Sequence, residues 1–352
     1  MKIASIFAVS LCALLACTGT PQAQTPETKS VIVSDPAVEA LVSPDAKVDM
    51  LATGFGFAEG IVWMQKKGKP GFLVMSDIPA NVIFKITPDG KQSLYMDRSG
   101  YTGYDIWRVG FIQNNGREKN DPKYEEFPMI GSNGLTLDAQ GRLLIASWTG
   151  RSIDRIESDG KRTILAARYE GKRFGGTNDL IAKKNGTIYF TDGYNGMRGR
   201  DKDPSKELDF RGVFMLKNGK VTRIAPEIET PNGLALSPDE KYLYLNNGGL
   251  KKIRRYEVQA DDTPVNPTMF FDMSEDRSRG IADGMKVDTK GNIYTSGPRG
   301  IWIISPQGKL LGKIIVPEQV ANLTFGDADY KTLYIAARSS IYKIRLKTAG
   351  IP

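Results

Sequence analysis

The stretch T-P-N-G-L-A-L-S-P-D-E-K-Y-L-Y-L-N-N, residues 230–247, contains the unit from which most of the chain is built. A small polar anchor residue, Asn232, opens a short apolar strand, a turn with Pro and Asp follows, and a second apolar strand begins at Tyr242. The same pattern occurs six times. Its anchors are Glu59, Asn133, Asn178, Asn232, Asp283 and Asn322. This repetition predicts a closed array of small β-units.

Each unit continues with a third strand, and most units with a fourth. The turns are often of the Asp-Gly type, as in P-D-G-K at residues 88–91, and such turns favour tight hairpins because they accept positive φ. We therefore predict an all-β fold over residues 46–350, a six-bladed β-propeller of four-stranded antiparallel blades with a central metal site. The last unit lacks a fourth strand, and residues 47–55 are expected to supply it and close the ring.

The composition narrows the chemistry. The chain has 352 residues, a formal net charge of +8, no histidine, and cysteine only at Cys12 and Cys17. These absences exclude Ser-His-Asp and Cys-His nucleophiles and any metal site built from histidine or several thiolates. Carboxylates, amides, hydroxyls, Lys, Arg or a metal held by oxygen remain. The positive charge is scattered and matches no nucleic-acid motif, so we expect no nucleic-acid partner.

The N-terminus predicts export. Residues 1–17 combine a basic start with a short apolar run, and Leu14-Leu15-Ala16-Cys17 resembles a bacterial lipoprotein cleavage box. We expect lipid attachment at Cys17 and a tether over residues 18–45. The protein would then face the periplasm from the outer membrane, because Thr18 rather than Asp follows the cysteine. The alternative is ordinary signal cleavage, which would give a soluble periplasmic or secreted protein.

An insertion at about residues 100–130 interrupts the first unit with polar runs and several aromatic residues. Long loops without repeats of their own are either functional lids or surface excursions. We favour a lid over the mouth of the channel, with a plain surface loop as the alternative.

The anchors predict a metal site. Innermost propeller strands line the axis, so anchors in equivalent register can converge there. Glu59, Asn178, Asn232 and Asp283 would together offer two carboxylates and two amides. This all-oxygen set suits Ca²⁺ best, with Mn²⁺, Mg²⁺ or Zn²⁺ as other candidates. Asn and Asp also begin turns in many proteins, but six of them in one register favour a site.

Several segments resemble the senescence-marker-protein/gluconolactonase/luciferin-regenerating-enzyme family, and particularly its exported bacterial members. The similarity covers about residues 54–346 and is strongest in F-A-E-G-I-V-W from Phe57, P-N-G-L-A-L-S from Pro231 and A-D-G-M-K-V-D from Ala282. The resemblance implies a six-bladed propeller whose divalent metal is held by Glu59, Asn232 and Asp283.

The resemblance also implies roles for further residues. Asp283 would be the general base as well as a ligand, Asn178 would lie against metal and substrate, and Asp179 would sit directly behind the ligands. Asn133, Arg173 and Tyr194 are further candidates for substrate binding. Some segments depart from the family pattern. Ser147-Trp148-Thr149-Gly150 stands where relatives often carry E-H-G. The pocket wall therefore differs, and the identity of the sugar in the substrate stays open.

The leading functional hypothesis is a divalent-metal-dependent lactonase, a carboxylic ester hydrolase that opens a sugar lactone or a related lactone or ester. The alternative is a non-catalytic binding propeller of the cell envelope that calcium stabilises, since fold alone does not assign function. We expect a monomer whose partner is a small-molecule lactone, and which meets a membrane only through the lipid at Cys17.

Overall fold

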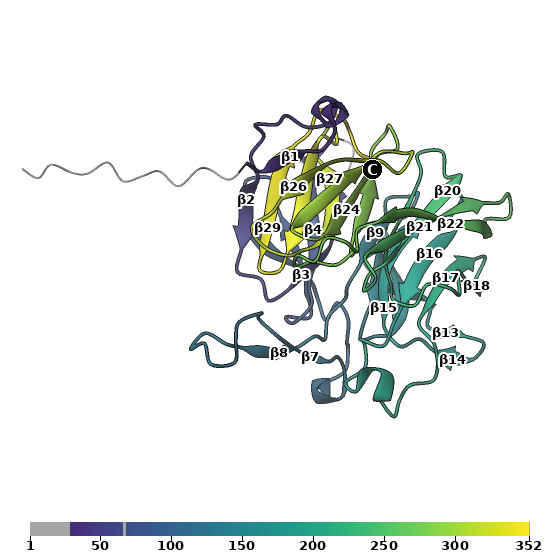
Figure 1. Ribbon diagram of the computed structural model, residues 1–352. Helices are drawn as coiled ribbons and strands as arrows, with labels where there is room; N and C mark the ends of the chain where they lie inside the picture. Colours follow the sequence, from purple (N-terminus) through teal and green to yellow (C-terminus); the bar gives the residue numbers. More distant parts are fainter. Residues whose placement is uncertain (1–28, 66–67, 352) are drawn as a thin grey trace, which may run out of the picture.

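The computed structural model describes residues 29–65 and 68–351, and Figure 1 shows its strands grouped into blades around an axis. Six antiparallel sheets form the blades, which confirms the predicted six-bladed β-propeller. Within each blade the strands follow chain order from the axis outward, except that blades five and six each take their outermost strand from the N-terminal side.

The strands of the first three blades have these bounds. Blade one contains β3 (Ala58–Met64), β4 (Phe72–Asp77), β5 (Val82–Ile86) and β6 (Gln92–Asp97). Blade two contains β9 (Leu135–Leu137), β10 (Leu143–Ser147), β11 (Ser152–Ile156) and β12 (Arg162–Ala166). Blade three contains β15 (Thr177–Ala182), β16 (Ile188–Asp192), β17 (Gly212–Lys217) and β18 (Lys220–Ile224).

The other three blades follow the same scheme. Blade four contains β19 (Pro231–Leu236), β20 (Tyr242–Asn247), β21 (Lys252–Val258) and β22 (Pro264–Asp272). Blade five contains β23 (Met285–Val287), β24 (Ile293–Gly297), β25 (Gly300–Ile304), β26 (Leu310–Ile315) and β1 (Val31–Val33). Blade six contains β27 (Val320–Gly326), β28 (Thr332–Ala337), β29 (Ser340–Arg345) and β2 (Asp49–Thr53).

The ring closes as the sequence predicts. Strand β2 pairs antiparallel with β29, with Met50 opposite Tyr342, and Thr53 Oγ1 lies 3.0 Å from Ser340 Oγ. This pairing ties the N-terminal side of the domain to its last blade and covers an edge that would otherwise be free.

The segment before β2 differs from the expectation of a tether over residues 18–45. Residues 31–42 pack on blade five, where β1 adds a fifth strand by pairing with β26. The 3₁₀ helix η1 (Pro36–Ala40) begins at Asp35, whose carboxylate accepts a hydrogen bond from the Ala37 amide. The apolar side chains of Val38 and Val42 are fully buried there. Residues 1–28, which include the predicted signal and Cys17, lie outside the described residues.

Apolar side chains between neighbouring blades hold the ring together. Phe174, Phe190 and Phe214, at blade three, meet with ring centroids 5.2–5.4 Å apart and share a core cluster with Leu144 and Ile153 of blade two. Between blades one and six, the Trp63 ring stacks on Tyr334 at 5.6 Å. No helix within residues 29–65 and 68–351 is long and apolar enough to span a membrane.

The two ends of the propeller differ. The hairpin β7 (Ile112–Asn114)–β8 (Glu126–Pro128), the hairpin β13 (Arg168–Tyr169)–β14 (Lys172–Arg173) and the 3₁₀ helix η3 (Arg200–Lys202) all lie at the lower end in Figure 1, whereas the C-terminus lies at the upper end. The insertion also contains the 3₁₀ helix η2 (Ile106–Arg108). We call the lower end the loop face.

Candidate metal and catalytic site

The six anchors lie where the inner strands begin. Glu59, Asn178, Asn232 and Asn322 stand near the starts of β3, β15, β19 and β27. Asn133 and Asp283 each precede an inner strand by two residues. The equivalent position in all six blades confirms that the repeat brings the anchors into one register.

The glycine after four of the anchors explains the E-G, N-G and D-G dipeptides. A side chain at Gly60, Gly134, Gly233 or Gly284 would collide with the anchor region of the next blade, and for Gly60 and Gly233 the obstacle is the backbone of Asn133 and Asp283. Only glycine lets neighbouring inner strands approach this closely. The dipeptides therefore set the small radius that brings the anchors together.

Glu59 is buried within the ring. Burial raises the pKa of its carboxyl to about 7, and the nearby carboxylate of Asp179 adds to this rise. The Gly60 amide donates to Glu59 Oε2 at 2.8 Å and Asn322 Nδ2 donates to the same oxygen at 3.3 Å. The anchor of blade six thus orients the anchor of blade one.

Asp283 faces the same point. Burial raises the pKa of its carboxyl well above the ordinary value, and the carboxylates of Glu59 and Asp179 raise it further, while a hydrogen bond from Asn232 opposes this. Its backbone is fixed on both sides, because Asp283 N donates to Ser296 Oγ at 2.7 Å and Asn246 Nδ2 donates to Asp283 O at 2.6 Å. Glu59 and Asn232 therefore both lie near the Asp283 carboxyl.

Asp179 and Lys286 complete the charge pattern. Burial raises the pKa of Asp179, whose Oδ1 accepts from the Leu180 amide at 2.9 Å. Burial lowers the pKa of Lys286, while Asp179 and Glu59 act in the opposite direction. Lys286 Nζ donates to Met285 O at 3.1 Å. No motif in the sequence marks Lys286, which supplies a positive charge near the carboxyl groups of Asp179 and Glu59.

A cavity of about 150 Å³ continues the channel toward the end opposite the loop face. Inner-strand residues from all six blades line it: Val62, Thr136, Ile181, Ala235, Lys286 and Thr324. Ile351, near the C-terminus, lines it as well. Lys286 therefore lies inside the channel, on the side of the ring of anchors that faces away from the loop face.

The ring fits a hard cation. Three carboxyl groups with raised pKa values and one ammonium leave an excess of negative charge when ionised, and a cation at their centre would favour the ionised state. Two buried oxygens here, Asn133 Oδ1 and Asp179 Oδ2, have no hydrogen-bond partner. No group of three or more His, Cys, Asp and Glu suited to a metal occurs in the described part of the chain. The predicted ligand set would not form such a group, because it contains two amides and only two carboxylates.

The other predicted site residues, Asn178, Arg173 and Tyr194, lie at or near the loop face. Asn178 is tied into the ring because the Gly134 amide donates to its carbonyl oxygen at 2.8 Å. Arg173 lies in the β13–β14 hairpin, and its guanidinium donates to Gly150 O at 3.4 Å. Tyr194 is buried in the β16–β17 loop, with Lys206 and Arg211 over its ring at 5.4 and 5.2 Å. Substrate contacts of Arg173 and Tyr194 remain a prediction.

The insertion spans the loop face. Near blade two, the Phe111 ring contacts Trp148 at 5.8 Å, and near blade three the Gly110 amide donates to Gly196 O at 3.0 Å. At its far end, Gly116 lies against the guanidinium groups of Arg279 and Arg338, which belong to loops of blades five and six. Blades two and five are opposite each other across the axis, as are blades three and six. The insertion therefore extends from one side of the loop face to the other.

These features define a propeller whose inner strands form a buried ring of carboxylates and amides at one end of the channel. The model of the SMP-30/Gluconolactonase/LRE-like region matches residues 57–339, and the chain belongs to this family. The gluconolactonase of Zymomonas mobilis is 32% identical over 328 residues, which cover 90% of this chain and 85% of that protein.

Solved structures agree with the fold. A gluconolactonase from Xanthomonas campestris has a TM-score of 0.72 and 26% identity, and the match covers 90% of this chain and 94% of that one. Regucalcin from Agrobacterium tumefaciens, a calcium-binding protein, has a TM-score of 0.62 over 86% of this chain and 95% of its own. Its identity of 16% supports the fold alone.

Proposed function

We propose that this protein is a divalent-metal-dependent lactonase that hydrolyses a sugar lactone. The observation that carries the proposal is the position of Asp283. Its carboxyl is buried beside Glu59 and Asn232 and has a raised pKa, in a chain of the gluconolactonase family. A carboxylate of raised basicity is a better general base at neutral pH than an ordinary aspartate.

The reaction would proceed by attack of water on the lactone carbonyl. The Asp283 carboxylate accepts a proton as the water oxygen bonds to the carbonyl carbon. The bond from that carbon to the ring oxygen then breaks, and the proton passes to this oxygen, which becomes a hydroxyl. Asn232 orients the Asp283 carboxylate through its hydrogen bond, and Ser296 and Asn246 fix the backbone of Asp283.

Glu59, Asn232, Asp283 and Asn178 would hold the cation, for which Ca²⁺ is our first choice. A cation in this ring supplies Lewis-acid polarisation of the carbonyl and stabilises the developing oxyanion. Asp179 would lie behind the ligands, and Lys286 lies on the side of the ring that faces away from the loop face, so both would tune the charge of the ring. The insertion, which spans the loop face, would act as a lid that limits access of water.

A lactone panel tests the proposal. Protein stripped with a chelator should hydrolyse D-gluconolactone and dihydrocoumarin at background rates, and Ca²⁺, Mn²⁺, Mg²⁺ or Zn²⁺ should restore turnover, followed as acid release. Calorimetric titration of the same four ions should show binding that Glu59→Gln weakens. Metal binding without hydrolysis of any lactone would favour the non-catalytic binding propeller instead.

We further propose that Cys17 is lipidated and anchors the protein at the outer membrane, facing the periplasm. Its support is the sequence L-L-A-C at residues 14–17 alone. Replacing Cys17 with Ser should move the full-length protein from the membrane fraction to the soluble fraction after cell lysis. Equal membrane association of the parent and the variant would contradict the lipid anchor.

A further inference from the structure

Two arginines from different blades meet under the insertion. Arg279 lies in the loop before β23, and Arg338 in the turn between β28 and β29. Both guanidinium groups approach the same glycine of the insertion, Gly116. The two guanidinium groups are close enough to repel each other. Burial lowers the pKa of Arg338, and the positive charge of Arg279 lowers it further.

Neither guanidinium is neutralised within the described residues. The structure records no ion pair and no side-chain hydrogen bond for Arg279 or Arg338 among residues 29–65 and 68–351, and Arg338 Nε is buried without a partner. The negative charge of Glu318 acts on Arg338 and raises its pKa. That carboxylate already accepts hydrogen bonds from Ser339 N at 2.8 Å, Ser339 Oγ at 2.9 Å and Tyr342 Oη at 2.9 Å.

Arg279 and Arg338 are connected to the loops that carry two of the anchors. Arg338 O accepts from the amide of Ala58 at 2.6 Å, and Ala58 directly precedes Glu59. Arg279 stands four residues before Asp283. The loop between them is fixed because Ser296 Oγ, the acceptor of the Asp283 amide, donates to Ile281 O at 3.3 Å. The arginines therefore flank the side of the mouth that carries Glu59 and Asp283.

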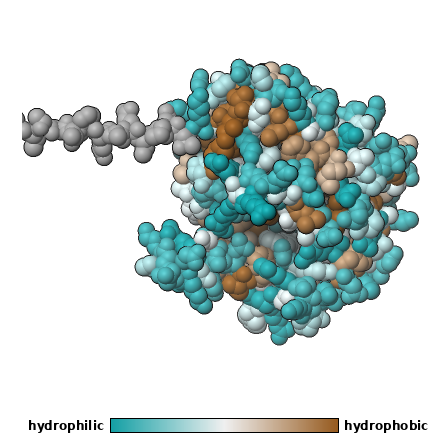
Figure 2. Space-filling view, viewed as in Figure 1, coloured by the Kyte–Doolittle hydropathy of each residue, from teal (hydrophilic) through white to brown (hydrophobic). Residues whose placement is uncertain are grey.

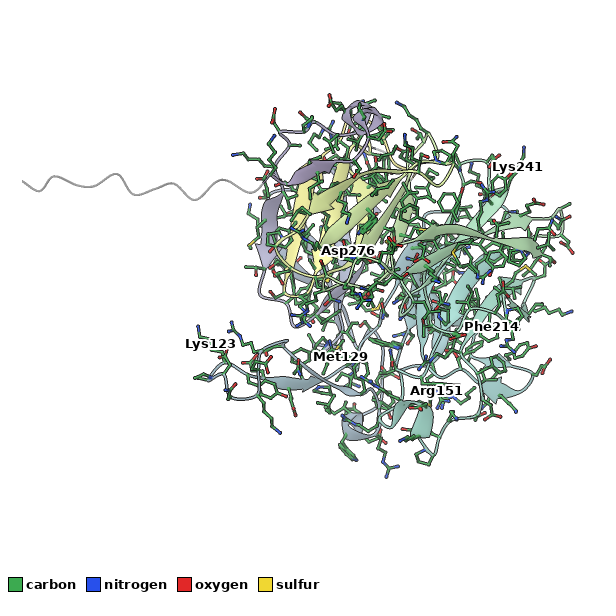
Figure 3. The ribbon with its side chains drawn as sticks, in the orientation of Figure 1. Lys123, Met129, Arg151, Phe214, Lys241 and Asp276 are labelled. Atoms are coloured by element: carbon green, nitrogen blue, oxygen red, sulfur yellow. The ribbon has the colours of Figure 1, made fainter. Side chains whose placement is uncertain are left out.

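Arg338 is partly buried and Arg279 is exposed, and an anion between them would offset the repulsion of their two positive charges. Arginine forks bind carboxylate and phosphate groups through paired charged hydrogen bonds. The insertion places no counter-charge on the pair, because Gly116, which has no side chain, is the residue in contact. The part of the molecule that projects at the lower left of Figure 2 is mainly hydrophilic. Figure 3 shows Lys123 at the outer end of this segment and Met129 at its inner end near the ring.

We propose that Arg279 and Arg338 bind an anionic substituent of the substrate, so that the lactone carries a carboxylate or phosphate in addition to its ring ester. This inference rests on the proposed lactonase function and narrows its substrate class. The anionic group would lie under the insertion while the ring carbonyl reaches Asp283. The product would then be a hydroxy acid with a second anionic group, and a reaction that oxidises a sugar acid or a sugar phosphate at its anomeric carbon must supply the substrate.

Kinetics with three lactones test the proposal. The probes are D-glucaro-1,4-lactone, which carries a carboxylate, 6-phospho-D-gluconolactone, which carries a phosphate, and the neutral D-gluconolactone. For the parent protein we expect at least about tenfold higher kcat/KM for one anionic lactone, mainly through KM, and the preferred probe identifies the group. Arg338→Met and Arg279→Met should each lower that value by about tenfold to hundredfold, the effect of losing a charged hydrogen bond. The value for D-gluconolactone should stay within about twofold.

Controls separate recognition from folding. Arg338→Lys keeps the positive charge but loses the paired N–H groups of the guanidinium. This variant should retain part of the preference for the anionic lactone over D-gluconolactone. Arg277→Met removes an exposed arginine of the same loop and should leave all three lactones unaffected. Equal losses for neutral and anionic lactones in the Arg279 and Arg338 variants would overturn the proposal, as would a parent protein without preference.

A binding measurement separates this inference from the proposed function. Calorimetric titration with D-glucarate and with inorganic phosphate needs no turnover. Binding that Arg338→Met removes, in a protein that hydrolyses no lactone, would support the anion site and contradict the lactonase. The absence of binding of either anion, in a protein that hydrolyses D-gluconolactone, would contradict the anion site and leave the lactonase in place.

Discussion

Asp283→Asn is expected to lower kcat for lactone hydrolysis by about 10²–10⁴ at saturating Ca²⁺, the usual scale for the loss of a general base. The amide keeps the size of the side chain and one oxygen, but it cannot accept a proton from water. The backbone of Asp283 is held by Ser296 and Asn246, so the substitution should leave the loop in place. The measurement is the initial rate of acid release at several Ca²⁺ concentrations, extrapolated to saturation, with thermal unfolding as a check of the fold.

Two neighbouring variants serve as controls for metal binding. Asn232→Ala and Glu59→Gln remove a ligand without removing the base, so both should raise the Ca²⁺ concentration needed and lose less rate once Ca²⁺ is in excess. The comparison must be made at saturation, because otherwise a binding defect imitates a chemical one. Near-full turnover of Asp283→Asn under these conditions would mean that Asp283 is not the base. Asp179 would then be the next candidate.

The ring of anchors could be predicted because the repeat places each anchor at the same position of its blade. Anchors in one register, each followed by an inner strand, must converge if the array closes, and the pairing of β2 with β29 closes it. The turn motifs and the alternation of apolar and polar residues were sufficient to predict the strands of the blades. The hydrogen bond from Asn322 to Glu59 follows from the same register, although the sequence does not indicate which anchors bind a metal and which bind each other.

Other features depend on contacts between distant parts of the chain. Lys286 resembles any lysine in a half-exposed strand, and only the closed ring places it inside the channel. Arg279 and Arg338 belong to different blades, so their proximity requires the loops of both. The segment of residues 31–42 lies outside the repeat, and its apolar residues Val38 and Val42 become part of the core only because blade five offers them a surface.

Gly233→Ala is expected to damage both stability and activity, because it tests the close approach of the inner strands directly. A methyl group at this position would collide with the carbonyl group of Asp283 in the next blade. That carbonyl is also the acceptor of Asn246 Nδ2, so the Asp283 backbone cannot move away without losing a buried hydrogen bond. Overpacking of this kind typically costs about 1–3 kcal/mol. Displacement of a catalytic group by about 1 Å can cost roughly 10²-fold in rate.

The expected result is a lower melting temperature, weaker Ca²⁺ binding, and a kcat/KM that excess Ca²⁺ does not restore. Gly193→Ala is the matched control, because a methyl group there would meet no atom within 4 Å and the residue has no positive φ. It should melt like the parent protein. If Gly233→Ala also melts and binds Ca²⁺ like the parent, the ring tolerates a wider spacing, and the glycine after four of the anchors has another cause. If it melts normally but loses Ca²⁺ binding and turnover together, the spacing of the inner strands determines the geometry of the site rather than the stability of the fold.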